Sequence, residues 1–134
     1  MEILMKLILK SLSAIALGLS VFTAATAAPS YLITHNKTNV ESNAYIATVP
    51  SIYPTAAQST RQVAWNLVRI ACFGHSKDNK CSAVIKMATN TTNPVVLGTV
   101  TMDLTSGDIT PKAITSQGYT LTVNGPGETT ISKN

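Results

Sequence analysis

Turn-forming residues recur along the chain after residue 28 and leave only short stretches between them. Gly, Pro, Asn and Asp gather in the runs Gly74–Lys80, Asn90–Pro94, Thr105–Asp108 and Asn124–Gly127, and the run Ser51–Thr60 holds Pro54 among small and polar residues. The stretches between these turns contain many Val, Ile and Thr residues, whose branched side chains favour β-strands. Short strands separated by turn signals at intervals of about ten residues are typical of a sandwich or small barrel. The sequence therefore predicts an all-β fold, a small antiparallel β-sandwich or barrel of about seven strands.

Two hairpins can be placed from the pattern. In residues 118–123 (GYTLTV), apolar side chains alternate with Thr, which predicts a half-buried strand, and residues 128–131 (ETTI) are expected to pair back on it. A second hairpin is expected after a strand over residues 95–104, where Gly107 would supply the positive φ of the loop. Pro111, in the return strand, indicates an edge position.

The segment Arg61–Phe73 (RQVAWNLVRIACF) fits two structures. As a strand it would be apolar on both faces and would lie centrally in the sheet. As a helix it would place Leu67, Val68 and Ala71 on one stripe. We expect the strand, because a disulfide-closed hairpin would follow directly, and the helix remains the alternative.

The start of the chain has the three zones of a secretory signal peptide. A positively charged start, an uncharged apolar stretch and a run of small residues follow one another in this order. We expect a cleaved signal helix over residues 1–27 and a single β domain over residues 28–134. Lys6 and Lys10 interrupt an apolar stretch that would otherwise approach the roughly 20 residues of a membrane span, so no stable membrane anchor is expected after cleavage. The sequence therefore predicts an exported protein, either periplasmic or secreted.

Cys72 and Cys81 are the two cysteines of the chain. Export would bring them into an oxidising compartment, where disulfides form and persist. A disulfide closing so short a loop contributes about 2.5–3 kcal/mol by restricting the unfolded chain. The spacing is not C-x-x-C, and no second cysteine pair completes a zinc site. We therefore expect a structural disulfide and no metal site.

Charge and motifs argue against several classes of function. Ten basic and six acidic residues are scattered along the chain, whereas nucleic-acid binding requires a dense Lys/Arg face, so no nucleic-acid partner is expected. The run 124–128 (NGPGE) lacks the Lys of a phosphate loop, and no cofactor is expected.

His75 could contact Asp78, but no nucleophile is placed beside it. Asp103 and Asp108 flank a hairpin loop, where Asp commonly serves the turn itself. No catalytic residue is therefore assigned.

The strongest candidate for partner contact is the segment 44–54 (AYIATVPSIYP), in which Tyr45 precedes Pro50 and Tyr53 directly precedes Pro54. Exposed aromatic residues are favoured at binding sites. His75, in the loop between the cysteines, is expected to be exposed as loop residues usually are. The sequence thus favours a non-enzymatic domain that binds a macromolecule of unknown identity. A small envelope hydrolase and a structural subunit that pairs through its edge strands are the alternatives, and no oligomeric state is specified.

Four runs of residues carry a likeness to known proteins: 71–75 (ACFGH), 81–83 (CSA), 105–111 (TSGDITP) and 118–131 (GYTLTVNGPGETTI). Together they resemble a group of small exported proteins of unknown function from Legionella-type bacteria. The likeness covers nearly all of the chain after residue 28. It implies a bacterial protein of the periplasm or the exterior, and it implies no activity and no site residue.

Overall fold

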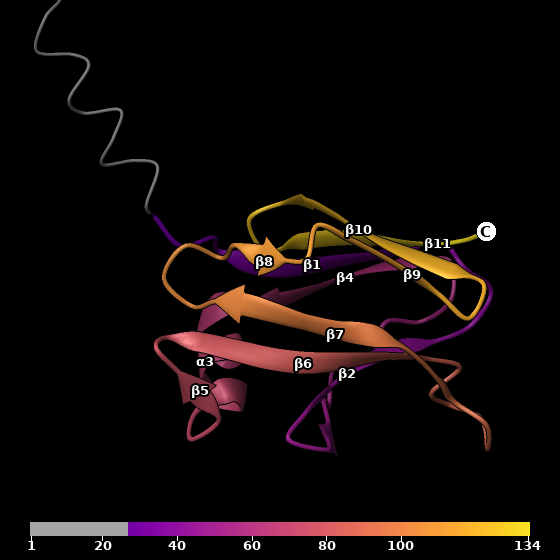
Figure 1. Ribbon diagram of the computed structural model, residues 1–134, viewed down its shortest axis with the longest axis horizontal. Coiled ribbons are helices and arrows are strands. Elements are labelled where there is room, and N and C mark those ends of the chain that lie inside the picture. The colour runs from indigo at the N-terminus through magenta and orange to yellow at the C-terminus, as the bar shows by residue number, and fades with distance from the viewer. Residues whose placement is uncertain (1–26) are drawn as a thin grey trace, which may run out of the picture.

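Two β-sheets pack face to face in the computed structural model, which describes residues 27–134 (Figure 1). One sheet has the strand order β4-β1-β11-β10-β9, and the other has the order β3-β2-β6-β7-β8 with β5 paired to β6. The strands are β1 (Tyr31–Asn36), β2 (Ser42–Ile46), β3 (Val49–Pro50), β4 (Ser59–Ala64), β5 (Ser76–Lys77), β6 (Lys80–Met87), β7 (Val95–Asp103), β8 (Ile109–Thr110), β9 (Ala113–Ser116), β10 (Tyr119–Gly125) and β11 (Glu128–Lys133). The predicted β-sandwich is confirmed. The predicted signal helix lies outside the described residues, apart from Ala27.

Residues 27–134 contain more strands than the seven or so expected, because three of the strands are two-residue segments beside turns. These are β3, β5 and β8. The sheets are also not purely antiparallel, since β1 and β11 run parallel with Ile33 opposite Glu128. The first and last strands of the described chain are therefore neighbours in the five-stranded sheet.

Both predicted hairpins are present. In the five-stranded sheet β10 pairs antiparallel with β11, with Leu121 opposite Ile131. In the other sheet β7 pairs with β8, and Gly107 in the loop between them has φ +79°. A Cβ at Gly107 would lie 2.6 Å from the ring of Pro29, so both the backbone angle and the close packing require Gly there. Pro111 directly follows β8 at the end of its sheet, which confirms the predicted edge position.

The expectation of one strand over Arg61–Phe73 is wrong for most of the segment. Strand β4 ends at Ala64, and helix α3 runs over Trp65–Cys72. The helix brings Trp65, Val68 and Cys72 onto one buried face, and the Trp65 indole N–H donates to the carbonyl of Leu104 at 3.0 Å. The helical alternative is the correct one for this part, because packing of that face outweighs the strand preference of Val68 and its neighbours.

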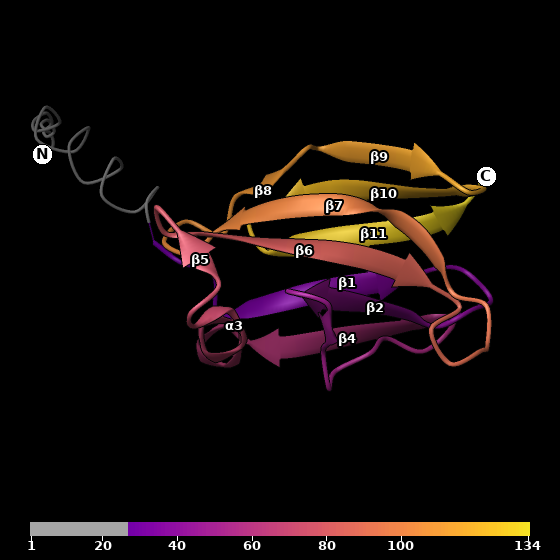
Figure 2. The same cartoon turned by 60° about the horizontal axis from the view of Figure 1, so that its bottom comes forward.

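Helix α3 lies at one end of the sandwich, beside the end of β4 (Figure 2). The predicted disulfide between Cys72 and Cys81 is present, and it joins the end of α3 to the start of β6 with a Cα–Cα distance of 5.9 Å. Between the cysteines, β5 and β6 form a tight hairpin whose turn residues Asp78 and Asn79 both have positive φ. Both cysteines are buried, so the disulfide fixes the helix to the core.

The hydrophobic core fills the space between the sheets. Its largest fully buried apolar side chains are Met87, Leu97, Leu121 and Ile131. They come from β6, β7, β10 and β11, so both sheets contribute to one cluster. Among residues 27–134, no helix is long and apolar enough to cross a membrane.

Candidate functional site

A cavity of about 120 Å³ lies between the two sheets, and its lining includes residues of β4 and β2. Alternation along the strands directs Leu32 and Val63 into it from the five-stranded sheet and Ala44 and Ile85 from the other sheet. Its deep walls are buried and apolar, and they include Val68, Ala83, Val100, Met102, Leu121 and Ile131. The cavity is therefore continuous with the core of the sandwich.

The rim of the cavity is formed by residues that line it and also face solvent. Arg61 of β4 and Ala71 of α3 are exposed, while Tyr53 is half-buried. The Arg61 guanidinium carbon lies 5.6 Å from the centre of the Tyr53 ring, a distance at which a cation is attracted to an aromatic face. None of the ion pairs within residues 27–134 includes Arg61. The cavity thus opens beside a positive charge that no carboxylate of the described part of the chain neutralises.

A row of polar side chains crosses the otherwise apolar wall of the five-stranded sheet. Thr34 of β1 is paired with Arg61 of β4 on one side and with Thr129 of β11 on the other. All three line the cavity, and burial increases from the exposed Arg61 to Thr129, which is 7% exposed. Ser42 and Thr55 line the same cavity and are also buried. The hydroxyls of Ser42, Thr55 and Thr129 make no hydrogen bond to another of the described residues.

The size of the cavity limits what can enter it. An engineered protein cavity of about 150 Å³ holds one benzene molecule, so this one accommodates a single ring or an aliphatic group of about six carbons. Larger ligand sites in proteins enclose at least about 300 Å³. A bound molecule would therefore place only a small apolar part between the sheets and keep the rest outside.

The structure separates the three residues predicted to contact a partner. Tyr53 lies at the rim of the cavity, whereas Tyr45 lies on the outer face of the six-stranded sheet, where the Lys86 ammonium is 4.3 Å from its ring centre. His75 is exposed in the disulfide loop, and its backbone N–H donates to the carbonyl of Cys72. These residues form no single surface, and their part in binding stays a prediction.

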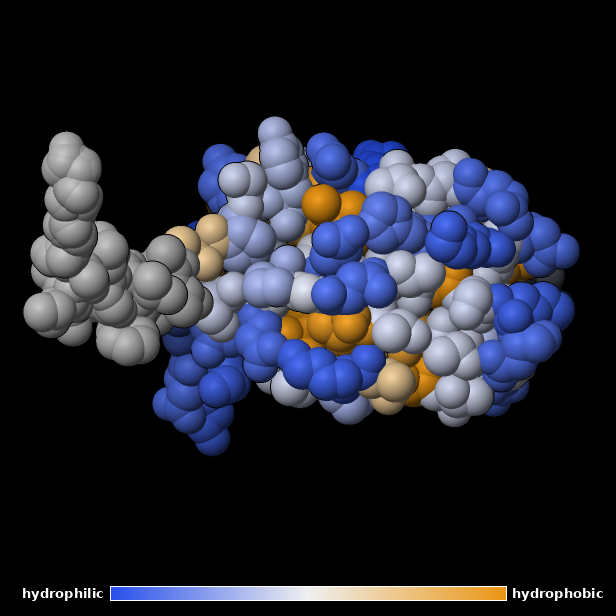
Figure 3. Space-filling model, turned by 90° about the horizontal axis from the view of Figure 1, so that it is seen from above, coloured by the Kyte–Doolittle hydropathy of each residue, from blue (hydrophilic) through white to orange (hydrophobic). Residues whose placement is uncertain are grey.

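A second polar arrangement lies on the outer face of the five-stranded sheet. His35 Nε2 is 2.6 Å from Glu128 Oε2, and His35 Nδ1 is 3.0 Å from the hydroxyl of Thr60. A hydroxyl, an imidazole and a carboxylate in this order are the groups of nucleophilic hydrolases. Here they lie half-exposed beside a shallow polar depression, on a face that is mostly hydrophilic with small separate hydrophobic areas (Figure 3). The sequence pattern did not single out this trio, because the three residues meet only through strand pairing.

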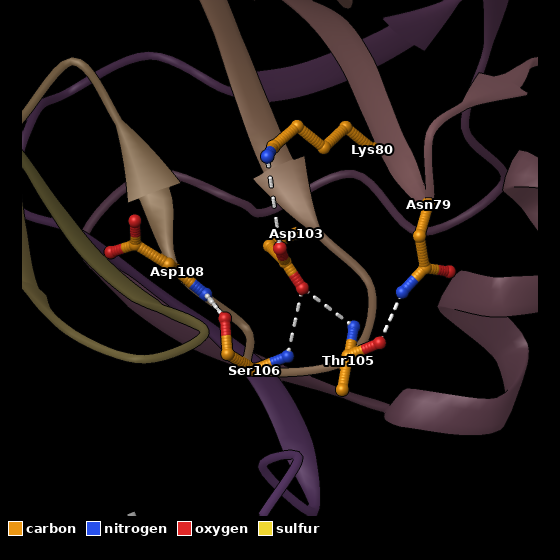
Figure 4. A network of polar contacts seen from close by, with 6 residues as sticks. All are labelled: Asn79, Lys80, Asp103, Thr105, Ser106 and Asp108. Atoms are coloured by element: carbon orange, nitrogen blue, oxygen red, sulfur yellow. Dashed lines mark hydrogen bonds and ion pairs between the residues drawn. The ribbon is translucent and has the colours of Figure 1, made fainter. Parts of the chain in front are cut away.

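Asp103 and Asp108, the other acidic candidates, serve the loop between β7 and β8 (Figure 4). Asp103 Oδ1 accepts hydrogen bonds from the backbone N–H groups of Ser106 at 3.0 Å and Thr105 at 2.9 Å. The Ser106 hydroxyl accepts one from the N–H of Asp108, and the Asp108 carboxylate pairs with Lys112. The two carboxylates therefore act in turn formation. Within residues 27–134 no cluster of His, Cys, Asp and Glu could hold a metal ion.

The hydrogen bonds from Ser106 and Thr105 hold the pKa of Asp103 below its ordinary value. The stabilisation from its ionised form is present above the pKa of the unfolded chain and is lost as the pH falls through the lowered folded pKa. We expect wild type to lose more stability than Asp103→Asn when the pH falls from about 7 to about 2.5. Urea unfolding midpoints of both proteins at the two pH values measure this. An equal loss in both proteins would contradict the assignment.

Sequence reasoning missed the cavity residues on β1 and β4. Alternation in residues 31–36 (YLITHN) does place Leu32 and Thr34 on one face, which is the signal that was available. It could not show that Arg61 pairs with Thr34, since that depends on where β4 ends and on its register with β1.

Comparison with known proteins places the chain among exported bacterial proteins. A family model described as "T2SS substrate NttC" matches residues 5–134. A solved structure described as the Legionella pneumophila type II secretion system substrate NttC is 64% identical and superposes with a TM-score of 0.79. The match covers 80% of this chain and 100% of that one. A search of the curated proteins found no match. The predicted likeness to small exported proteins of Legionella-type bacteria is confirmed.

Proposed function

Because the chain belongs to the NttC family of type II secretion system substrates, and is therefore exported through the periplasm and secreted, we propose that it acts outside the cell as a non-enzymatic binding domain. Its site is the cavity between the sheets. The partner is a macromolecule or molecular assembly that inserts one small apolar group between β4 and β2. The observation that carries this proposal is an apolar cavity that reaches the surface.

The energetics of the cavity support a binding role. Apolar side chains in the cavity wall lack the packing contacts that a filled core would give them, so the open cavity lowers the stability of the domain. Ala83, buried in its wall, could be replaced by a larger apolar residue that would fill part of it. A domain of this size has a total stability of only about 5–15 kcal/mol, so an unfilled cavity is a considerable cost that occupation by a ligand would offset.

The surface near the rim also suits a large partner. Val49 is 62% exposed and Ile52 is 79% exposed, in the hairpin and loop that lead to Tyr53. Exposed apolar residues around a pocket are common at protein interaction sites. A partner that inserts a group beside Tyr53 would therefore find further apolar contacts outside the cavity.

Blocking the rim is expected to abolish uptake of a small apolar molecule. We expect benzene to shift the methyl NMR signals of Val68, Val100 and Ile131 in the wild-type domain, and Ala71→Trp to weaken this binding at least about tenfold, because the indole occupies the opening. The control is Ile70→Trp, since Ile70 is on the same helix and exposed but does not line the cavity. Ala83→Leu, which fills the cavity from within, should give the same loss.

Two outcomes would contradict the proposal. If benzene shifted none of these methyl signals, the cavity would not be a binding site. If the domain hydrolysed p-nitrophenyl acetate and His35→Ala abolished the activity, the hydrolase alternative would be favoured, with Thr60, His35 and Glu128 as its groups.

A further inference from the structure

We infer that the apolar group that the partner inserts into the cavity is the aliphatic chain of an anionic amphiphile, which also carries a carboxylate head group. The chain lies between the sheets, and Arg61 with the hydroxyl of Thr34 holds the carboxylate near the rim. The inference rests on the proposed function, because it names the chemical class of molecule that the same cavity takes.

The first argument is the position of the charge. Arg61 is the one charged residue among those that line the cavity, and the lining contains no acidic residue. A cationic head group would meet an uncompensated positive charge there, and a neutral one would gain no ion pair. A guanidinium offers a rigid fork of donors that matches both oxygens of a carboxylate. The positive charge of Arg61 therefore favours a head group with a negative charge.

The second argument is that Arg61 is already positioned. Its guanidinium lies over the ring of Tyr53, which restricts the side chain before any ligand arrives. Pre-positioning lowers the entropy lost when a head group binds. The nearest inward-facing neighbours toward α3 are Val63 and Leu32, so an aliphatic chain attached to the head group would pass directly onto apolar surface.

The third argument is the set of hydroxyls inside the cavity. Ser42, Thr55 and Thr129 are each more than nine-tenths buried, and their hydroxyls lack a hydrogen-bond partner among the described residues. Buried hydroxyls are almost always hydrogen-bonded in native proteins, so these indicate a polar group that enters from outside the chain. Thr34 lies between Arg61 and Thr129, so its hydroxyl can donate to a carboxylate held by Arg61.

The experiment compares three six-carbon probes that differ only in the head group: hexanoate, 1-hexanol and hexylammonium. Each is titrated at about pH 7, where hexanoate is ionised, and the shifts of the cavity methyl signals are followed by NMR. Wild type is expected to bind hexanoate about tenfold more tightly than hexanol and to bind hexylammonium least. Arg61→Gln should weaken hexanoate binding about tenfold and leave hexanol binding unchanged, and Thr34→Val should weaken hexanoate binding about threefold.

The matched control is Lys86→Gln, which removes a positive charge of another cation–aromatic pair, with Tyr45 on the outer face of the other sheet. It should leave the preference for hexanoate intact. Equal binding of hexanol and hexanoate by wild type would overturn the anionic class and leave the proposed cavity function standing. Binding of none of the probes would overturn both. A preference for hexanoate that persists in Arg61→Gln would overturn the role of Arg61.

Discussion

Replacing Asn36 by Ala is expected to lower the free energy of unfolding by about 3 kcal/mol or more. Asn36 is 2% exposed at the end of β1. Its Nδ2 donates to the carbonyl of Val40 at 2.8 Å and lies 3.2 Å from the carbonyls of Thr55 and Ala56. Its Oδ1 accepts from the N–H and the hydroxyl of Thr38. Alanine would leave these buried groups without partners, and each unsatisfied group costs about 1–3 kcal/mol.

Equilibrium unfolding in urea, followed by circular dichroism, measures this loss. The control is Asn66→Ala, because Asn66 is exposed on α3 and should change stability by no more than about 0.5 kcal/mol. The loops that Asn36 joins carry Thr55, a wall residue of the cavity, so binding of the six-carbon probes should weaken as well. A loss below about 1 kcal/mol would show that water replaces the amide there.

The double replacement Cys72→Ala/Cys81→Ala is expected to lower stability by about 3 kcal/mol, which corresponds to a fall of roughly 10–20 °C in the thermal unfolding midpoint. The disulfide restricts the unfolded chain, and its removal also leaves buried volume, because Cys72 and Cys81 are 0% and 1% exposed. The effect should be strongest on α3, since the disulfide joins the end of that helix to β6.

Thermal unfolding with and without a reducing agent tests this assignment. The reducing agent should lower the midpoint of wild type toward that of the double variant and should leave the variant itself unchanged. Hydrogen exchange of the α3 amides gives a local measurement, and faster exchange is expected in the variant. A variant as stable as wild type would mean that packing alone holds α3.

The strand pattern in the sequence was sufficient for the class of fold. Alternation in residues 118–123 and the loop position of Gly107 depend on neighbouring residues only, and both features are found in the structure. The pairing of β1 with β11 could not be predicted, because a parallel contact between the two ends of the domain leaves no local signal. Segment 61–73 was ambiguous for a related reason: its conformation depends on burial of Trp65 against the sheets.

The candidate site was less accessible to sequence reasoning than the fold. Tyr53 was identified from its aromatic–proline surroundings, and it lies at the rim of the cavity. No pattern in the sequence joined Tyr53 to Arg61 or Thr34, since these residues meet only after β1 and β4 are paired in register. A cavity is the volume that packing leaves unfilled, and no linear pattern encodes that volume directly.

The pairing of β1 with β11 bears on when the chain can fold during export. A chain that emerges from a ribosome or a translocation channel with its N-terminus first exposes β1 long before β11. Until then β1 can pair only with β4, and the middle of the five-stranded sheet is missing. Contacts between distant parts of a chain also form slowly. The strand order therefore implies that the five-stranded sheet is completed only after β11 has emerged.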